Sequence, residues 1–379
     1  MIYLMSLILL IWIAFFIDAA WGLRTIERLE SEKELEDGPL ISIIVAAKNE
    51  EEHIRKSIES QLSQKYKLIE WILVNDRSED RTGDIMDGLS VRHPHMKVIH
   101  IKELPEGWLG KNHALYKGYL ESKGEWLLFT DADVLYKEET VGKAASFLSR
   151  NSIDHMTAAP DLYAKGFWLK SFVAFFLFGF SYYKRPWRAN IDSSKIGVGV
   201  GAFNLIRKKA YETIGTHQSI KERPDDDLQL GMMVKKFGLK QRMVSATKLL
   251  KVEWYPSLQA AFKGLEKNTF AGLHYQFPMV FLAVAGVFCS QVLPFLTIFS
   301  PDPLLRVLSF IVVILIFSLY YLIVKKLTSF SPLLFFVFPA TALLFIYSIV
   351  RAVLLTIKRG GIEWRGTVYS LKELRKRER

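Results

Sequence analysis

Two kinds of hydrophobic pattern divide the chain. Four long and almost uninterrupted apolar runs occupy residues 1–23, about 277–299, 304–324 and 332–357. A helix rises about 1.5 Å per residue, so roughly 20 apolar residues cross the hydrocarbon core of a bilayer. These runs predict transmembrane helices, whereas the short apolar runs of residues 38–260, which alternate with polar stretches, predict an aqueous domain.

The first run is interpreted as a retained membrane helix with its amino terminus outside. No Lys or Arg precedes residue 24, whereas a cleaved signal peptide, the alternative, has a basic segment before a shorter apolar core. Arg24, Arg28 and Lys33 follow the run and favour the cytoplasmic side. Residues 24–37 are then a charged linker, and the aqueous domain is expected in the cytoplasm of a multi-pass cell-membrane protein.

The carboxyl-terminal part comprises an interface segment and apolar helices over residues 261–357 and a basic tail over residues 358–379. Its charges conflict with a simple count of spans. Lys325 and Lys326 favour the cytoplasm, but three complete spans would leave the tail outside, although its basic residues favour the inside. Because Pro339 interrupts the last run, we expect that run to form a re-entrant or hairpin segment.

A Phe-rich stretch, residues 167–183, lies inside the aqueous domain, and Lys165 and Lys184 flank it. An interfacial amphipathic helix is preferred over a span, because a span would divide the domain between two compartments. A buried core helix is the remaining alternative.

The aqueous domain has the pattern of an α/β protein. Strand candidates, mostly aliphatic or β-branched, are residues 40–47, 69–74, 97–101 and 126–130. Residues 50–64 between the first two have a helical pattern, with Asn49 as its N-cap. Alternating strands and helices predict a Rossmann-like, mostly parallel sheet with helices on both faces, in which ligands bind at the carboxyl ends of the strands.

Composition narrows the classes of function. Half of the 379 residues are hydrophobic and 23% are charged, which fits a chain that is part aqueous domain and part membrane protein. A single cysteine excludes an intrachain disulfide framework and a Cys-cluster zinc site. The net charge of +11 suits an anionic membrane or phosphorylated substrates. Nucleic-acid binding is not expected, because the basic residues lack interleaved aromatic residues.

Polar clusters follow three of the predicted strands. The first strand ends before Asn49 and Glu50, the second before Asp76, and the fourth before Asp131 and Asp133. Residues i and i+2 of an extended segment point to the same side, so both carboxylates of the last pair face one ligand. Two oxygen ligands suit Mg²⁺ or Mn²⁺ completed by phosphate oxygens, which implies a diphosphate substrate.

Two further segments carry candidate chemistry. Lys111, after the Gly107 and Gly110 turn, supplies a positive charge for phosphate, although no P-loop is present. The glycines of residues 197–201 do not form a dinucleotide fingerprint either. The adjacent carboxylates Asp225, Asp226 and Asp227 repel one another, which raises a pKa and suits a general base. An acidic first turn of a helix over residues 228–237 is the alternative, and both readings are compatible.

In combination these segments resemble family 2 glycosyltransferases, which have the GT-A fold. The resemblance covers residues 38–260 and rests on residues 42–51, 74–82, 130–133, 199–207 and 226–231. The segment around Lys111 and the late Glu363-Trp364-Arg365-Gly366-x-x-Tyr369 motif resemble the branch that acts on lipids, namely carotenoid, hopanoid and ceramide glycosyltransferases. Diaponeurosporenoate-type carotenoid glycosyltransferases share that late motif.

The resemblance implies a role for each matched residue. Asn49, Glu50 and Asp76 would bind the nucleotide base and ribose, Lys111 the diphosphate or ribose, Asp131 the nucleotide and Asp133 the metal. Asp227 matches the general base and Asp226 its acidic neighbour. There are two departures, since Asn75 replaces the first acid of an Asp-Asp pair and the QxxRW motif of processive polysaccharide synthases is absent after residue 227.

The expected activity is therefore an inverting, metal-dependent transfer of one sugar from a nucleoside-diphosphate sugar, a UDP-sugar by preference, to a membrane lipid. The alternatives are a polyprenyl-phosphate glycosyltransferase or polysaccharide synthase, and a non-catalytic membrane scaffold of the same fold.

Overall fold

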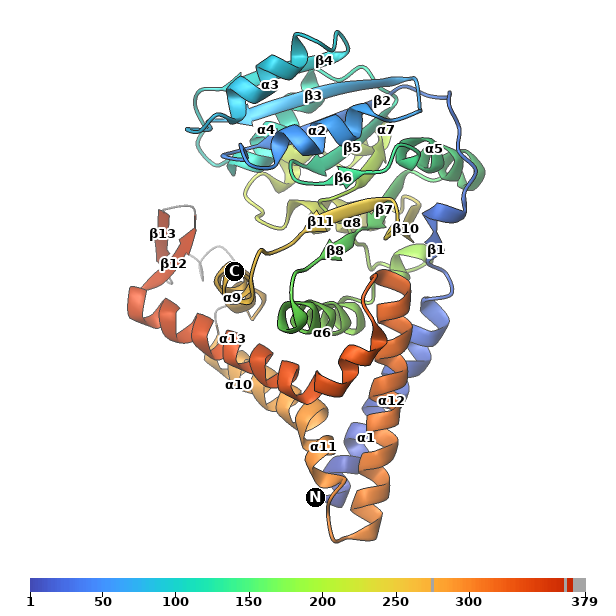
Figure 1. Ribbon diagram of the computed structural model, residues 1–379, viewed down its shortest axis with the longest axis vertical. Coiled ribbons are helices and arrows are strands. Elements are labelled where there is room, and N and C mark those ends of the chain that lie inside the picture. The colour runs from blue at the N-terminus through green and yellow to red at the C-terminus, as the bar shows by residue number, and fades with distance from the viewer. Residues whose placement is uncertain (274–275, 365–366, 371–379) are drawn as a thin grey trace.

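The computed structural model describes residues 1–273, 276–364 and 367–370, and it joins a sheet domain to a group of long apolar helices (Figure 1). Within this described part, an eight-stranded sheet forms the centre of the domain. In spatial order its strands are β1 (Glu27–Arg28), β10 (Gln241–Ser245), β7 (His155–Ala159), β9 (Asn204–Arg207), β5 (Trp126–Asp131), β2 (Ile41–Ala47), β3 (Ile69–Asp76) and β4 (Met96–Ile101).

The sheet is mixed but mostly parallel, as the sequence predicts. Only β9 runs antiparallel to its neighbours β5 and β7, and the other pairs are parallel. The predicted strands 40–47, 69–74, 97–101 and 126–130 are confirmed as β2, β3, β4 and β5, with ends that differ by at most two residues. Because β2, β3 and β5 are parallel neighbours, their carboxyl ends share one edge of the sheet.

Helices cover both faces because the strands alternate their buried side chains between two cores. Ile43 and Val45 of β2 pack on the side of α2 (Ile54–Leu62), α3 (Thr82–Ser90) and α5 (Thr140–Asn151). Ile44 packs on the opposite side, with α4 (Gly110–Leu120), α7 (Lys208–Thr213) and α8 (Asp226–Lys236). This period of two is the expected geometry of a strand that is buried on both faces.

The first predicted helix begins later than expected, and Asn49 is not its N-cap. The helix α2 starts at Ile54 rather than Glu50. Asn49 adopts a left-handed backbone with a φ of 56°, and its side-chain oxygen accepts a hydrogen bond from the backbone N–H of Glu79 at 2.8 Å. The amide side chain therefore ties the loop after β2 to the loop after β3, where Glu50 N–H also donates to Thr82 Oγ1.

Smaller sheets and turns complete the domain. A three-stranded sheet combines β6 (Leu135–Tyr136), β11 (Leu250–Glu253) and β8 (Asp161–Tyr163), and a hairpin of β12 (Gly361–Trp364) and β13 (Thr367–Ser370) follows the last helix. Short 3-10 turns are η1 (Leu29–Ser31) and η3 (His217–Ile220). The charged linker takes part in the fold, because its β1 pairs with β10 and its Leu29 is buried in the core.

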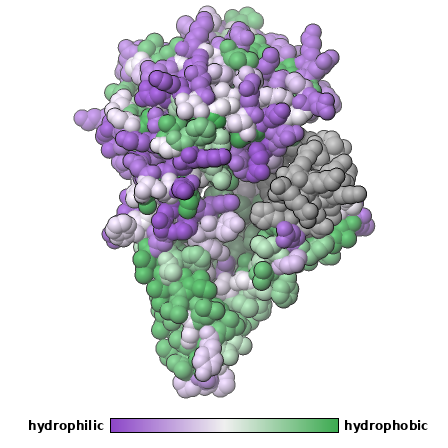
Figure 2. All heavy atoms as spheres, turned by 180° about the vertical axis from the view of Figure 1, so that it is seen from behind, coloured by the Kyte–Doolittle hydropathy of each residue, from purple (hydrophilic) through white to green (hydrophobic). Residues whose placement is uncertain are grey.

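Four apolar segments of the described chain are long enough to cross a membrane, as predicted. They are α1 (Ile2–Gly22), α10 (Phe277–Val287) with η4 (Phe288–Val292) and α11 (Leu293–Thr297), α12 (Pro303–Leu327), and η5 (Pro332–Val337) with α13 (Phe338–Arg359). Large apolar side chains such as Phe310 of α12 remain exposed on them. Figure 2 shows the same division as a hydrophobic lower part and a polar upper part. This surface fits hydrocarbon better than water.

The last apolar segment changes from a 3-10 turn to an α-helix just before Pro339. The 3-10 turn η5 ends at Val337, α13 begins at Phe338, and α13 passes beneath α6 and α9 (Leu258–Gly272) in Figure 1 instead of running along α12. Both ends of the segment contact the sheet-domain side of the molecule. Ser329 Oγ donates to Asp161 of β8 at 2.5 Å, and Arg359 pairs with Glu266 of α9 at 3.3 Å.

The Phe-rich stretch forms α6 (Phe167–Lys184), which lies between the sheet domain and the long helices (Figure 1). Its Phe172 and Phe175 are almost fully buried, with exposed fractions of 0% and 2%, and Phe175 contacts Phe338 of α13. Most of α6 is thus covered by protein, and its exposed aromatic side chains lie at its ends, as in Phe167 and Tyr183.

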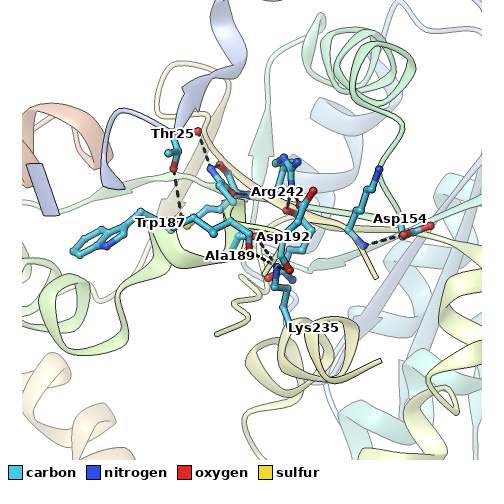
Figure 3. A network of polar contacts seen from close by, with 12 residues as sticks. Thr25, Asp154, Trp187, Ala189, Asp192, Lys235 and Arg242 are labelled. Carbon is cyan, nitrogen blue, oxygen red and sulfur yellow. Dashed lines mark hydrogen bonds and ion pairs between the residues drawn. The ribbon is translucent and has the colours of Figure 1, made fainter. Parts of the chain in front are cut away.

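A polar junction joins the sheet domain to the end of the apolar helix α1 (Figure 3). The buried ammonium of Lys235, near the end of α8, donates to three backbone carbonyls after α6, those of Ala189, Ile191 and Asp192, at 3.4, 2.8 and 3.4 Å. Asn190 of the 3-10 turn η2 (Pro186–Asn190) donates to the backbone oxygen of Thr25. The helix α8 and the exit of α1 are therefore attached to the same turn.

Candidate active site

The carboxyl edge of the parallel strands gathers the predicted acidic residues. Asp76 is the last residue of β3 and Asp131 is the last residue of β5. The intervening β2 pairs with both strands, and its Ala46 lies opposite Asp131 while its Ala47 lies opposite Asn75. Parallel pairing thus brings the two carboxylates to one edge, one strand apart.

The helix α4 begins between these two carboxylates. A Cβ atom at Gly110, its first residue, would lie 2.1 Å from Asp76 Oδ2, so that only glycine fits there without a shift of the side chain. Lys111 follows, and its Nζ lies 2.8 Å from Asp131 Oδ1 and 3.4 Å from Asp226 Oδ1. One ammonium therefore links the end of β5 to the start of α8.

The start of α8 presents two carboxylates to this ammonium. Asp226 is the first residue of the helix, and only 5% of its surface is exposed. Asp227 accepts hydrogen bonds from two backbone N–H groups, from Gly201 to Oδ2 at 2.8 Å and from Leu228 to Oδ1 at 2.7 Å. Asp227 therefore contributes to the first turn of the helix while its carboxylate stays at the site.

The charges at this cluster shift the proton affinities of its members. Burial raises the pKa of Asp226 to about 7, with a further contribution from Asp227, although Lys111 opposes the rise. Burial also raises the pKa of Asp227. Burial alone would lower the pKa of Lys111, but Asp131, Asp226 and Asp227 raise it well above its ordinary value. The predicted rise of a pKa among the adjacent acids is thus present at both Asp226 and Asp227.

Asp133 lies near the cluster but not inside its cleft. Burial and the charge of Asp131 raise its pKa to about 6. Among the described residues, no group of three or more His, Cys, Asp or Glu side chains is arranged to hold a metal ion. A pair of carboxylates that repel each other still fits a divalent cation that takes its other ligands from a substrate diphosphate and water.

The remaining predicted binding residues lie on the other side of α4. The Asp76 side chain is buried and receives two hydrogen bonds from Arg77, at 2.8 and 3.0 Å. Asn49 and Glu50 lie in the loop after β2, and Asn49 is exposed while its side chain binds the neighbouring loop. The structure therefore brings Lys111, Asp131, Asp226 and Asp227 into direct contact or close range, with Asp76 beside Gly110 next to them. Asn49 and Glu50 do not line this cleft and instead contact the segment after β3.

A small cleft lies over the cluster and adds residues to which the sequence analysis assigns no role. Its wall includes Gly201, Asn204 and His217 beside the four charged residues. A residue larger than glycine does not fit at position 201 without a shift of Asp131, because a Cβ atom there would lie 2.4 Å from Asp131 Oδ2. No motif or spacing in the sequence marks His217 as a site residue. The turn η3 places it at the cleft, and a hydrogen bond of 2.6 Å joins its Nδ1 to the hydroxyl of Tyr211.

Residues 42–215, which contain most of this site, match the family model of Glycosyl transferase family 2. The chain carries a family 2 glycosyltransferase domain. This assignment confirms the resemblance found in the sequence, and with it the predicted α/β fold class of GT-A type joined to apolar helices. The matched range ends before α8, so Asp226 and Asp227 lie outside it.

Curated relatives of this glycosyltransferase domain match over part of their length. The probable glycosyltransferase YdaM of Bacillus subtilis is 38% identical over 106 residues, which are 27% of this chain and 24% of that protein. The 4,4'-diaponeurosporenoate glycosyltransferase of Staphylococcus haemolyticus is 34% identical over 118 residues, 31% of this chain and 30% of that protein. The chain thus matches less than a third of the length of these relatives.

Among solved structures, the mannosyltransferase PcManGT from Pyrobaculum calidifontis, in complex with GDP-Man and Mn²⁺, aligns with a TM-score of 0.48 and 14% identity. The alignment covers 93% of this chain and 98% of that one.

Proposed function

We propose that this protein is a membrane glycosyltransferase that transfers a single sugar from a nucleoside-diphosphate sugar, a UDP-sugar by preference, to a membrane lipid. The observation that carries the proposal is the contact of Lys111 with both Asp131 and Asp226 beside Asp227, at the strand edge of a family 2 domain. The ammonium of Lys111 at that edge is suited to bind a diphosphate, and a neighbouring carboxylate is suited to accept a proton.

The donor would lie along the carboxyl ends of β3, β2 and β5. In this proposal Asp76, Asn49 and Glu50 bind the nucleoside, and Lys111 binds the diphosphate. The ammonium of Lys111 lies within reach of the negative charge that develops on the leaving diphosphate, which is the kind of stabilisation that lowers a transition-state energy. Asp131, which now pairs with Lys111, would contact the nucleotide.

Asp133 together with Asp131 would hold Mg²⁺ or Mn²⁺. When bound, such an ion would neutralise part of the negative charge of the diphosphate. The support for this part of the proposal is the proximity of the two carboxylates, which raises the pKa of Asp133. An experiment with the purified protein in EDTA, followed by addition of either metal, tests the requirement.

Asp227 would act as the general base. The two backbone N–H groups that donate to the carboxylate of Asp227 favour its ionised form. Asp227 takes the proton of the acceptor oxygen, which forms a bond to the anomeric carbon. The bond from that carbon to the diphosphate oxygen breaks with its electron pair, and the configuration inverts.

The acceptor is proposed to be a lipid because the sheet domain is joined to four apolar segments that are long enough to cross a membrane. The α6, α9 and α13 helices form the layer between the domain and the hydrophobic part of the molecule (Figure 1). Trp254, which follows β11, contacts Phe176 of α6 in this layer, with their rings 4.6 Å apart. Aromatic side chains at such a boundary suit the headgroup region of a bilayer.

A donor screen tests the function. Full-length protein in detergent is incubated with radiolabelled UDP- and GDP-sugars and total membrane lipid, and the extracted lipid product is identified by mass spectrometry. A glycolipid with one sugar supports the proposal, whereas a polymer or a polyprenyl-phosphate sugar assigns the chain to one of the other acceptors. The Asp227→Asn and Asp131→Asn variants serve as controls, because a non-catalytic scaffold would give the same result with and without them.

A further inference from the structure

A glycine-rich loop packs directly against the backbone of α8 where the proposed base is located. A Cβ atom at Gly197 would lie 2.1 Å from the backbone oxygen of Gly231, and a Cβ atom at Gly199 would lie 1.8 Å from the backbone oxygen of Asp227. Gly201, two residues on, donates to the Asp227 carboxylate. The loop of residues 197–201 is therefore the surface that fixes where the first turn of α8 can lie.

A series of three buried, hydrogen-bonded side chains connects this loop to the backbone of Asp227. Gln241 of β10, His155 of β7 and Asn204 of β9 are exposed by 0%, 0% and 2%. Gln241 Nε2 lies 2.7 Å from His155 Nδ1, and His155 Nε2 lies 2.6 Å from Asn204 Oδ1. Asn204 Nδ2 donates to the backbone oxygen of Asp227 at 3.4 Å, the longest of these contacts.

Gln241 binds the backbone of the loop at Val198 through both polar atoms of its side-chain amide, in the pattern of a neighbouring strand. Its Oε1 accepts from Val198 N–H at 3.0 Å, and its Nε2 donates to Val198 C=O at 2.9 Å. Nε2 also lies 3.2 Å from the backbone oxygen of Gly231 in α8. Both the loop and the helix are thus bound to one buried amide.

The donor and the acceptor of each hydrogen bond among these three side chains can be assigned. Asn204 must present its N–H₂ to the carbonyl of Asp227, so its oxygen faces His155 and His155 carries its proton on Nε2. Nδ1 of His155 is then an acceptor, which matches the N–H₂ of Gln241. Each donor meets an acceptor, and the two hydrogens of Gln241 Nε2 are shared among His155 Nδ1 and the carbonyls of Val198 and Gly231. The reversal of one member of this buried network leaves a pair unmatched.

We infer that His155 and Gln241 are positioning residues, which act through Asn204 and residues 197–201 to hold the carboxylate of Asp227 in its place beside Asp131 and Lys111. This inference rests on the proposed role of Asp227 as the base. Neither residue contacts the substrate site itself. A packing role alone would make them replaceable by side chains of the same size, whereas the positioning role requires the donors and acceptors in their present order.

Three substitutions in the full-length protein separate the two roles. Gln241→Glu keeps the size and the acceptor for Val198 N–H but removes the donor to His155. His155→Phe removes both bonds, whereas His155→Gln restores an amide N–H near the position of Nε2. Thr140→Val is the matched control, because it removes a buried hydroxyl with bonds to the backbone oxygens of Lys137 and Leu249, at the other end of the domain.

Two measurements are made on each variant, both in detergent. Hydrogen exchange by mass spectrometry reports the backbone of residues 197–204 and 225–231 without any need for turnover. Transfer of a radiolabelled UDP-sugar to total membrane lipid gives kcat and the KM for the donor. A small displacement of a catalytic group lowers the rate by about tenfold to a hundredfold.

The expected result is faster exchange in both segments and a kcat lower by about tenfold or more for Gln241→Glu and His155→Phe, with little change in donor KM. His155→Gln should recover part of the loss, and Thr140→Val should change neither segment. Equal exchange and equal kcat for Gln241→Glu and Thr140→Val would overturn the inference. If the wild-type protein transfers no sugar, the proposed function fails, and unchanged exchange in the variants separately refutes the network.

Discussion

Asp226 and Asp227 are adjacent in sequence, but their surroundings give them different tasks. Asp226 pairs with Lys111, whereas Asp227 is held by backbone N–H groups of Gly201 and Leu228. In the proposed function the first carboxylate therefore belongs to the charge balance of the diphosphate site, and the second is available for proton transfer.

We expect Asp227→Asn to lower kcat for lipid glycosylation by about 10²–10⁴-fold, because loss of a general base has that effect. Donor binding should remain, as measured by calorimetry with UDP and Mn²⁺. Asp226→Asn should instead alter donor affinity, since it removes a charge beside Lys111. An unchanged kcat in Asp227→Asn would assign the base to another residue.

A second expectation concerns the glycine that touches the backbone of Asp227. Gly199→Ala should destabilise the domain by ~1–3 kcal/mol, because the added methyl group meets backbone and not a movable side chain. Gly88→Ala in α3 is the control, since a Cβ atom there meets nothing within 4 Å. It should stabilise the helix by ~0.5–1 kcal/mol. Thermal unfolding in detergent distinguishes the two, and a Gly199→Ala protein as stable as the wild type would contradict the close contact.

The buried His155 predicts a loss of stability in acid. Burial lowers its pKa from 6.5 to about 4. Between those values the unfolded chain binds more protons than the folded one, so the stability is fully present above pH 6.5 and falls as the pH drops toward 4. At pH 5 the loss due to this residue is ~2 kcal/mol. Unfolding midpoints at pH 7.5 and 5 should differ less in His155→Gln than in the wild type, and equal differences would exclude this assignment.

At the scale of elements, α8 is attached at both ends to parts of the molecule with different roles. Its first turn carries the acids, and Lys235 in its last turn binds the carbonyls that follow α6 (Figure 3). The helix thus connects the catalytic edge to the layer beside the membrane helices.

We expect Lys235→Met to lower the free energy of unfolding by ~1–3 kcal/mol, because it leaves three backbone carbonyls without their donor. Lys236→Met is the matched control, since the neighbouring Lys236 is exposed and its loss should change stability by less than ~0.5 kcal/mol. The comparison uses denaturant unfolding in detergent. Equal effects of the two substitutions would show that the buried ammonium is dispensable.

The elements that the sequence predicts are those whose buried positions are apolar. Residues of β2, β3 and β5 such as Ile43, Leu73 and Leu128 form continuous apolar runs, and the acids after them mark the edge of the site. The sequence does not predict the strands β7, β9 and β10, because several of their buried positions are polar, among them His155, Asn204 and Gln241. Their hydrogen bonds exist only after the chain has folded.

Prediction of the site residues from the sequence is limited for the same reason. Lys111, Asp131, Asp226 and Asp227 follow from strand ends and charge patterns, but His217 and Gly201 come to the cleft through tertiary packing. Asn49 is predicted to cap a helix, yet it joins two loops, because its side-chain oxygen accepts from Glu79 N–H and its own N–H donates to Ser78 Oγ.

At the scale of the whole molecule, the sidedness of the membrane part can be tested. Ser329 and Arg359, on either side of the last apolar segment, both contact the sheet-domain side. We therefore expect that the segment re-enters and that the end of α13 lies on the cytoplasmic side with the domain. This arrangement also removes the conflict that the basic tail creates for three complete spans.

Cysteine labelling in intact cells measures this sidedness. In a Cys289→Ser background, Lys358→Cys should react with a membrane-impermeant maleimide only after the cells are opened, whereas Pro301→Cys, in the turn before α12, should react in intact cells. Lys358 and Pro301 are both exposed. Reaction of Lys358→Cys in intact cells would show that the last segment crosses completely.

The strand β1 lies only a few residues after α1, and its partner β10 follows more than two hundred residues later in the chain. A ribosome that synthesises this protein releases the anchor long before the last strand of the sheet exists. In the proposed membrane protein, the growing polypeptide therefore completes its sheet while one edge is already tethered to the bilayer. Biogenesis would then be a surface-bound process, and misinsertion of the anchor would leave the enzyme with an open, aggregation-prone edge.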